Sequence, residues 1–367
     1  MRNVKLSYIA KINSLSLSQK DTISNVKYLD TSNLTSNTIE NFQYFKMFDD
    51  KLPSRAKRKV KQNTILYSTV RPNQKHFGIL KNLDFSSILV STGFCTIDVD
   101  EDIADPDFIY YYITQDFMTK KMQSLAEQST TSYPSITPND VKNIEINLPN
   151  IEVQRKIGKF LSDIEWKIKT NSKINDNLEK QMNFVFKNMM SKAMNNKIKG
   201  EYVLVKNLTQ VITGKEDANF SDENGKYKFF TCSNEALKCN EYKFNSSSIL
   251  IAGNGDFNVK HYTGKFNAYQ RTYVLTPQKD YYALLYLSSV ERINALKLRS
   301  TGSIIKFITK NDIESIPVFI PWDKNILNIL NQLLSLKDKK SNENEYLASL
   351  RDYLLPLLLN GQVTIED

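Results

Sequence analysis

The sequence has no long hydrophobic run. None of its stretches reaches the roughly 18 apolar residues that mark a membrane-spanning helix. Its first residues, MRNVKLSYIAKINS, lack the continuous apolar core of a secretory signal. The three cysteines, Cys95, Cys232 and Cys239, are odd in number and scattered, which without an export signal indicates reduced thiols. We therefore expect a cytoplasmic chain that makes no membrane contact.

The sequence also has little with which to bind a metal or carry out catalysis. His76 and His261 are its only histidines, and Cys232 and Cys239 lie seven apart with no His or Cys beside them, which is unlike zinc-site spacing. It contains neither the Asn-Pro-Pro-aromatic motif of amino-methyltransferases nor a glycine-rich methyl-donor loop. We expect no metal site and no catalytic residue in this chain.

Acidic residues are missing from one basic segment. The chain carries a net charge of +9, and 51–81 contains nine Lys or Arg and no Asp or Glu. The rest of the chain therefore sums to zero. A local excess of one sign is the electrostatic footprint of a polyanion-binding surface. The alternative is a solvated basic loop.

What the sequence does contain is a duplication. NDVKNIEINLPN begins at Asn139 and NDIESIPVFIPW begins at Asn311, 172 positions later. Upstream, QSTTSYPSIT parallels RSTGSIIKFIT, and YYYITQDF parallels YYALLYLS, whereas the interiors between these anchors differ. A period this long indicates a duplicated domain rather than a solenoid unit. A length of 367 residues and a hydrophobic content of 41% fit two globular domains.

Each copy reads as a mixture of α and β structure. Short segments rich in β-branched and aromatic residues predict strands, and longer segments with helical spacing of Tyr, Ile, Met and Leu predict helices. The predicted strands are 64–70, 94–99, 248–253 and 271–276, and the predicted helices are 106–127 and 280–298.

A long helix is predicted after each of Pro149 and Pro321, because a proline favours a helix start just beyond it. The first helix carries a heptad stripe that is apolar at both ends and polar in the middle. The stripe comprises positions 157, 161, 164, 168, 171, 175, 178, 182, 185 and 189. Adding 172 predicts the matching stripe of the second helix at 329, 333, 336, 340, 343, 347, 350, 354, 357 and 361.

Pairing of the two stripes predicts their direction. A polar centre costs stability unless its groups meet partners, and antiparallel pairing would bring Asn171 and Asn175 near Lys340 and Glu343. These four residues would then fix the register, unless they face solvent where the helices diverge. Each helix of about 40 residues would be about 60 Å long.

The expected fold is therefore α+β, with two pseudo-symmetric globular α/β domains separated by two long antiparallel coiled-coil helices. The expected boundaries are 1–149 for the first domain, 150–196 for the first spacer helix, 197–320 for the second domain and 321–367 for the second spacer helix.

This organisation resembles the specificity subunit of type I restriction–modification systems. The resemblance also rests on VKQNTILYSTVRPNQKH from Val60, IEVQRKIGKFLSDIEWKI from Ile151 and LRDYLLPLLLNGQVTI from Leu350. It implies two target-recognition domains, each reading half of a bipartite, asymmetric duplex DNA site, with the helices fixing their spacing. It also implies that this chain performs no chemistry and binds no cofactor. Modification subunits would methylate adenine with S-adenosylmethionine, and restriction subunits would use ATP and Mg.

In the first domain, one basic run and one loop are the candidate DNA contacts. Lys and Arg of RAKRKVK would neutralise phosphates. In STVRPNQKH, Arg71 could pair with guanine, and Asn73 or Gln74 could bond adenine. For Arg71 the alternative is a surface salt bridge. The candidates are Arg55, Lys57, Arg58, Lys59, Lys61, Thr69, Arg71, Asn73, Gln74, Lys75 and His76.

In the second domain, AGNGDFNVKHY occupies the corresponding place, although its GNGD could be an ordinary turn. The candidates are Asn254, Asn258, Lys260 and His261, with Lys215 and Arg271 as secondary ones. Hydroxyls of the two shared loops could bond phosphates or merely form turns and helix caps. They are Ser129, Thr130, Ser300 and Thr301.

Aromatic residues outside the helical stripes predict a docking face for partner subunits, or packing onto the recognition domains. They are Phe160, Trp166, Phe184, Phe186, Tyr346 and Tyr353.

Two other classes of protein compete with the DNA-reading subunit. One is a self-contained DNA enzyme, either a nuclease or an adenine methyltransferase. Pro106-Asp107 and Asp338-Lys339-Lys340 could be fitted to a nuclease motif, but that Asp lies on the predicted second long helix. The other is a coiled-coil scaffold, which would leave the basic segment unexplained.

Overall fold

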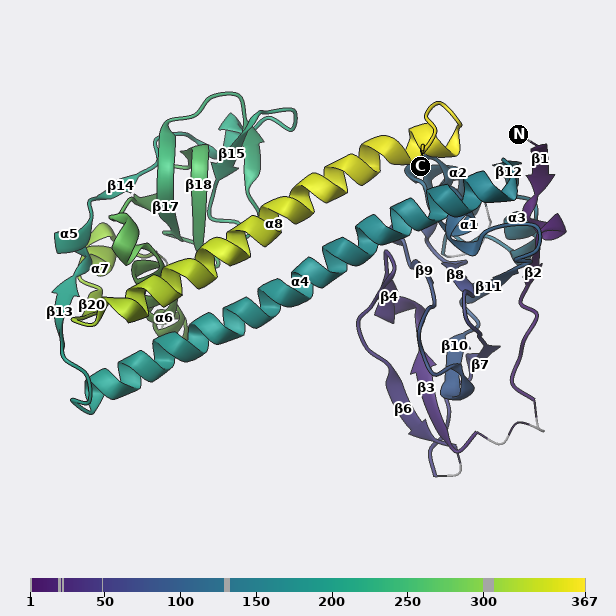
Figure 1. Ribbon diagram of the computed structural model, residues 1–367, viewed down its shortest axis with the longest axis horizontal. Coiled ribbons are helices and arrows are strands. Elements are labelled where there is room, and N and C mark those ends of the chain that lie inside the picture. Colours follow the sequence, from purple (N-terminus) through teal and green to yellow (C-terminus); the bar gives the residue numbers. More distant parts are fainter. Residues whose placement is uncertain are drawn as a thin grey trace. The chain divides into compact units, whose positions relative to one another are not determined.

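The computed structural model describes residues 2–18, 21, 23–47, 49–128, 133–299 and 307–366. They form two compact units (Figure 1). The first unit comprises 1–169 and 344–367, and the second comprises 170–343. Both units contain helices and sheets, as the sequence predicts.

The first unit is built on two four-stranded sheets, with strand orders β2-β11-β8-β9 and β6-β3-β10-β7. The predicted strands 64–70 and 94–99 are confirmed as β8 and β11. The first sheet consists of β2 (Ala10–Ile12), β8 (Ile65–Ser68), β9 (Phe77–Ile79) and β11 (Phe94–Val99). The second consists of β3 (Asn25–Leu29), β6 (Gln43–Lys46), β7 (Ala56–Lys59) and β10 (Ile88–Ser91).

The predicted helix 106–127 is two helices rather than one. The chain leaves α1 (Pro106–Ile113) at Thr114 and re-enters a helix as α2 (Asp116–Glu127). Thr114 closes α1 because its backbone N–H and its hydroxyl both donate to the carbonyl of Tyr110. Gln115 is extended, with ψ at 151°, so the two helices are separate. Short elements complete the unit, namely β1 (Arg2–Lys5), β4 (Leu34–Thr35), β5 (Thr38–Ile39), α3 (Pro138–Lys142) and β12 (Glu145–Leu148).

The second unit is built on one six-stranded sheet, of order β14-β19-β17-β18-β15-β16. Its long helix α6 (Tyr282–Arg299) packs on this sheet, and the Tyr282 hydroxyl donates to the carbonyl of Ser248 over 3.1 Å. The strands are β14 (Val211–Thr213), β15 (Tyr227–Phe230), β16 (Leu237–Cys239), β17 (Phe244–Ala252), β18 (Val259–Ala268) and β19 (Thr272–Leu275). The remaining elements are β13 (Gly200–Leu204), α5 (Val205–Leu208), α7 (Lys310–Glu314) and β20 (Pro317–Pro321).

The repeated phrase has the same structural role in both units. Its Asp closes a capping box, in which Thr137 and Asp140 cap α3, and Thr309 and Asp312 cap α7. The chain then forms a strand that pairs antiparallel with the first strand of its own unit, as β1–β12 and as β13–β20. The duplication therefore encodes a closing element that ties the two ends of each globular part together.

The long helices are α4 (Ile151–Met194) and α8 (Lys324–Leu359), and both contribute to the two units (Figure 1). In α4 the predicted stripe is confirmed, since seven of its ten positions are buried and the other three are half-buried. In α8 the predicted stripe is wrong by one residue. Leu330 and Leu334 are buried, whereas the predicted Ile329 and Leu336 are exposed. Two residues separate Pro321 from α8 but one separates Pro149 from α4, so the helices correspond at an offset of 173.

The contacts within the second unit show that α4 and α8 run antiparallel. Asn175 Nδ2 donates to Ser341 Oγ over 3.0 Å, and one turn further along α4 Glu179 pairs with Lys337 over 2.6 Å. The predicted register therefore needs correction. Asn175 meets Ser341 rather than Lys340 or Glu343, which pair with each other along α8. Asn171 is buried, as expected at the polar centre.

Candidate nucleic-acid interface

The loop after β8, residues 69–76, is the first candidate DNA-contacting element. It is called the reading loop below. Its backbone is fixed by the segment after α2, because Ile136 N–H donates to the Thr69 carbonyl and Arg71 N–H donates to the Pro134 carbonyl, both over 2.9 Å. Arg71 adopts a left-handed conformation, with φ at 47°, and its guanidinium lies 5.1 Å from the ring centre of Tyr133. A left-handed non-glycine residue costs about 1–3 kcal/mol and marks a position that the surrounding structure determines.

The loop divides into an outward and an inward part. Arg71, Asn73 and Gln74 are exposed. Lys75 pairs with Asp116 over 2.7 Å, and His76 Nδ1 lies 2.7 Å from the Leu34 carbonyl. The first three residues therefore remain the candidates for base contact. Lys75 and His76 turn toward their own unit.

Folding neutralises part of the basic segment. Lys59 pairs with Asp21, Lys75 with Asp116 and Lys81 with Asp107. The lysine beside each of Asp21 and Asp116 lowers the pKa of that carboxyl. The other six cations of the segment have no ion pair among the described residues. Three of the nine charges are thus partly offset, and the polyanion-binding charge is smaller than the sequence alone indicates.

The remaining candidates of the basic run differ in exposure. Arg55, Lys57 and Lys61 are exposed and suited to phosphate contact. Arg55 lies close to the reading loop, because its carbonyl accepts from Thr92 N–H and Thr69 bonds the neighbouring Gly93. The prediction that Arg58 faces outward to contact phosphates needs correction. It is half-buried, and its Nε is buried without a partner among the described residues.

In the second unit, four loops are joined by hydrogen bonds. Gly253 N–H donates to the Arg271 carbonyl, and Asn258 Nδ2 donates to the Cys232 carbonyl, both over 2.8 Å. Gly214 N–H donates to the Thr272 carbonyl over 3.0 Å. Arg271 and Lys215 are exposed, and Asn254 is half-buried. These loops, 214–217, 231–235, 253–258 and 269–271, form the second candidate interface.

Two predictions in the second unit need correction. Lys260 Nζ donates to the carbonyls of Thr231 and Ser233, and burial lowers its pKa. His261 lies against the Tyr286 ring, with 4.6 Å between ring centres, and burial lowers the pKa of its imidazole to about 4. Both side chains hold the unit together instead of facing outward, because β18 turns them onto a neighbouring loop and helix.

Ser129, Thr130, Ser300 and Thr301 lie outside the described residues. A residue that the sequence analysis missed is Tyr133, which is 60% exposed and supports Arg71. It lies in the duplicated segment QSTTSYPSIT, for which only the hydroxyls of Ser129 and Thr130 were predicted to contact DNA. An aromatic residue in a shared loop next to a variable basic loop is the feature that would have identified it.

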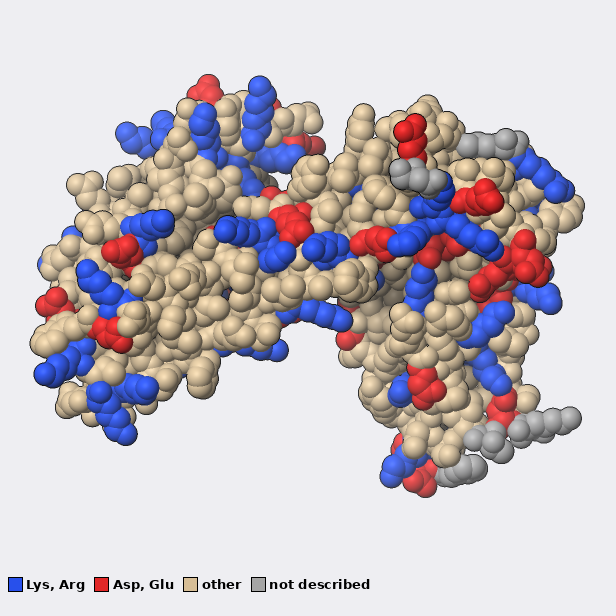
Figure 2. Space-filling view, viewed as in Figure 1, with Lys and Arg blue, Asp and Glu red and all other residues tan. Residues whose placement is uncertain are grey.

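Figure 2 shows how charged side chains are distributed on one face of the molecule. In Figure 2, lysine and arginine side chains project from the sheet of the second unit, and acidic and basic side chains are interspersed on the first. Among the described residues, no group of three or more His, Cys, Asp or Glu could hold a metal ion. Within the same residues, no helix is both long and apolar enough to cross a bilayer.

The fold defines a protein with two globular units that share a closing turn and strand pair but present different loop clusters. Comparison with known proteins identifies its family. Residues 3–180 and 199–346 match the family model of the type I restriction modification DNA specificity domain. The chain therefore belongs to this family.

Individual relatives agree. The chain is 37% identical over 166 residues to the EcoDI specificity subunit of Escherichia coli, which is 43% of this chain and 37% of that protein. It is 29% identical over 163 residues to the HindI specificity subunit of Haemophilus influenzae, which is 44% of this chain and 35% of that protein. The chain thus spans little more than a third of the length of these relatives. The S subunit of a type I system from M. genitalium shares the fold, with a TM-score of 0.66 at 16% identity over 97% of this chain and 95% of that one.

Proposed function

We propose that this chain is the DNA sequence-specificity subunit of a type I restriction–modification enzyme. Each globular unit reads one half of a bipartite, asymmetric duplex site, and the chain itself carries out no chemistry. The observation that carries the proposal is that one duplicated frame, closed by the same capped turn and strand, presents two unlike loop clusters. Two globular units with the same frame but different loop clusters suit a DNA site whose two halves differ in sequence.

The first unit has the larger set of candidate base and phosphate contacts. Arg71 and Asn73 have the donor patterns for guanine and adenine in the major groove, and Arg55, Lys57 and Lys61 supply phosphate contacts. In the second unit, Asn254, Lys215 and Arg271 offer the corresponding mixture. Backbone bonds between neighbouring loops support both readers, so the side chains start from defined positions.

The paired helices set the distance between the half-sites and dock the modification subunits. Trp166, Phe184, Tyr346 and Tyr353 are each 66–71% exposed, which suits a docking face. The other two predicted aromatic residues pack inward instead. Phe160 packs against the hydrophobic core of the first unit, and Phe186 is buried in the core of the second unit. S-adenosylmethionine is held by the modification subunits, and ATP and Mg by the restriction subunits.

Selection from a randomised duplex pool tests the proposal. The intact chain, assembled with its modification subunits, should enrich two short sequence blocks separated by a constant gap. Its affinity for the enriched duplex should fall steeply with salt, because phosphate contacts release counterions. Affinity that is independent of sequence, or that stays constant between low and high salt, would contradict it. Cleavage or methylation of DNA by the purified chain alone would favour a self-contained enzyme.

A further inference from the structure

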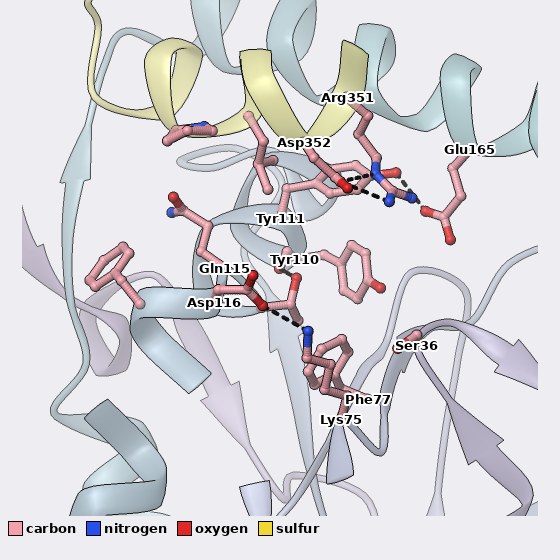
Figure 3. A pocket seen from close by; sticks show the side chains of 14 residues that line it. Ser36, Lys75, Phe77, Tyr110, Tyr111, Gln115, Asp116, Glu165, Arg351 and Asp352 are labelled. Atoms are coloured by element: carbon pink, nitrogen blue, oxygen red, sulfur yellow. Dashed lines mark hydrogen bonds and ion pairs between the residues drawn. The ribbon is translucent and has the colours of Figure 1, made fainter. Parts of the chain in front are cut away.

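In the first unit, one carboxylate of α4 is bound by three groups. Glu165 accepts from Asn37 Nδ2 over 3.0 Å and from the Tyr111 hydroxyl over 2.7 Å, and Lys169 Nζ lies 3.3 Å away. The Glu165 side chain is only 14% exposed. Figure 3 shows it beside Tyr111, where it projects from the helix that borders a cavity. A carboxylate with this many partners has one defined position.

The partner Asn37 belongs to the turn between β4 and β5, which also holds the end of the reading loop. Asn37 N–H donates to the Phe77 carbonyl over 2.8 Å, and its Oδ1 accepts from Ile79 N–H over 2.9 Å. Ser36 N–H donates to the Lys75 carbonyl over 2.9 Å. Both turn residues are left-handed, with φ of 44° and 62°, so the turn is a strained connector with a fixed shape.

The connector lies beside a cavity, which Ser36 lines. A cavity of about 380 Å³ separates the loop end at Lys75 and Phe77 from the helix side chains Glu165 and Arg351 (Figure 3). Around the cavity, ring contacts of Tyr110 with Phe77 and with Tyr111 link the loop end to Glu165, because the Tyr111 hydroxyl donates to that carboxylate. Two hydrogen bonds join the helix to the turn directly: Asn37 Nδ2 donates to the Glu165 carboxylate, and Lys169 Nζ donates to the Asn37 carbonyl over 2.7 Å.

The second unit has an acidic residue at the equivalent helical position. Glu165 is the fifteenth residue of α4, and Asp338 is the fifteenth residue of α8. Asp338 Oδ1 lies 3.6 Å from His261 Nδ1 on β18. The residue before His261 is Lys260, whose Nζ binds the carbonyls of the 231–235 loop, and β18 itself follows the 253–258 loop. The duplication therefore places an acid at the same point of each helix, against the strand or turn that leads to each reader.

We propose that Glu165 and Asp338 are equivalent positioning residues, each of which fixes one DNA-reading loop cluster to the helix pair. This inference rests on the proposed function, because it assigns the two carboxylates to the accuracy of base reading. Each acts only on its own unit. Loss of one carboxylate should therefore loosen one half-site and leave the other unchanged.

Hydrogen exchange of the intact chain without DNA tests the linkage independently of DNA reading. Glu165→Ala should raise amide exchange in 72–79 at least tenfold, because the turn that holds these residues loses its anchor. Glu165→Gln should restore part of the protection, since its carbonyl oxygen still accepts from Asn37. The matched control is Asp163→Ala on the same helix, where the exposed carboxylate pairs with Lys159. Unchanged exchange in Glu165→Ala, or equal loss of protection in both variants, overturns the proposal.

Selection from a randomised duplex pool, with modification subunits present, tests the effect on reading. Glu165→Ala should lower discrimination about tenfold at one half-site only, and Asp338→Ala at the other, which is the size of one lost base contact. Affinity for a scrambled duplex at low salt should match that of the parent chain. If both half-sites relax together, or neither does, the carboxylates are structural only. If the parent chain enriches no bipartite sequence, the proposed function fails, and hydrogen exchange alone decides the linkage.

Discussion

At the scale of single residues, the proposed function assigns base contact to Arg71 and phosphate contact to Lys57. Arg71 is exposed on a loop whose backbone is bonded on both sides, so its loss should remove a base contact worth about 1–3 kcal/mol. We expect Arg71→Ala to relax the preference at one base pair of the first half-site. Binding titrations with single-base variants of the enriched duplex measure this.

Lys57→Ala is the matched comparison, because Lys57 is exposed on the neighbouring strand β7. It should weaken all duplexes alike and lower the slope of log affinity against log salt by about one. A base-specific effect of Lys57→Ala, or a uniform one of Arg71→Ala, would reverse the two assignments.

The neighbouring side chains of His261 and Asp338 predict how stability depends on pH. Burial lowers the pKa of His261 to about 4 and raises that of Asp338 to about 6, with Glu179, Lys337 and Tyr286 as the charged or titratable neighbours. Between about pH 4 and 6.5 the unfolded chain binds more protons at His261, so this residue makes stability rise with pH. Over about pH 4 to 6 the folded chain binds more protons at Asp338, so this residue makes stability fall with pH.

The two trends oppose each other in the parent chain, and single variants should separate them. Asp338→Asn should show a urea unfolding midpoint that rises from about pH 4.5 to 6.5 more steeply than in the parent. His261→Gln should show a midpoint that rises less, or falls. Identical pH profiles of the three proteins would mean that neither group is buried as the structure places it.

At the scale of elements, the capped turn explains the phrase that the chain contains twice. Thr137 and Thr309 each accept from the backbone N–H of the third helical residue. Replacing either with Ala should cost about 1 kcal/mol of stability, and Thr→Ser should retain most of it. Urea unfolding, compared between Thr137→Ala and Thr309→Ala, tests the equivalence of the two turns. A loss in one variant alone would show that the repeat is not equivalent in energy.

The sequence predicted elements well where one period dominates. The α4 stripe is right because its heptad spacing continues unbroken through the polar centre. The α8 stripe was derived from α4 by a fixed offset and missed one inserted residue after Pro321. The break between α1 and α2 was missed because apolar spacing continues across Thr114. Capping by a side chain is a local event that spacing does not report.

The sequence predicted less of the candidate site. The basic composition of 51–81 was plain, but which lysines pair with Asp21, Asp107 and Asp116 depends on contacts between residues distant in the chain. Lys260 and His261 lie on alternate faces of β18. Only the folded structure shows that the 231–235 loop covers Lys260 and that α6 and α8 cover His261. The role of Asn37 depends on a left-handed turn, which no composition signal predicts.

At the scale of the whole molecule, the helix pair is proposed to determine the gap between the half-sites. Inserting one heptad into α4 after Asn175 and one into α8 before Ser341 keeps the stripes in phase and adds about 10 Å at 1.5 Å per residue. We expect the gap in the enriched sequence to lengthen by about three base pairs, at 3.4 Å each, while the two blocks stay the same. An insertion in α4 alone is the control, and it should lower stability because the stripes no longer match. If the number of base pairs between the two blocks stays the same after the double insertion, the helices do not set the spacing.

The most direct test of the central claim, that two unlike readers on one chain recognise two half-sites, is methylation-sensitive sequencing of the host genome with and without this gene. With the gene, methylated adenines should lie in one bipartite motif of two unlike blocks and a constant gap, and that motif should lose its methylation when the gene is removed. A methylation pattern that is unchanged without the gene, or a motif consisting of one continuous block, would contradict the account.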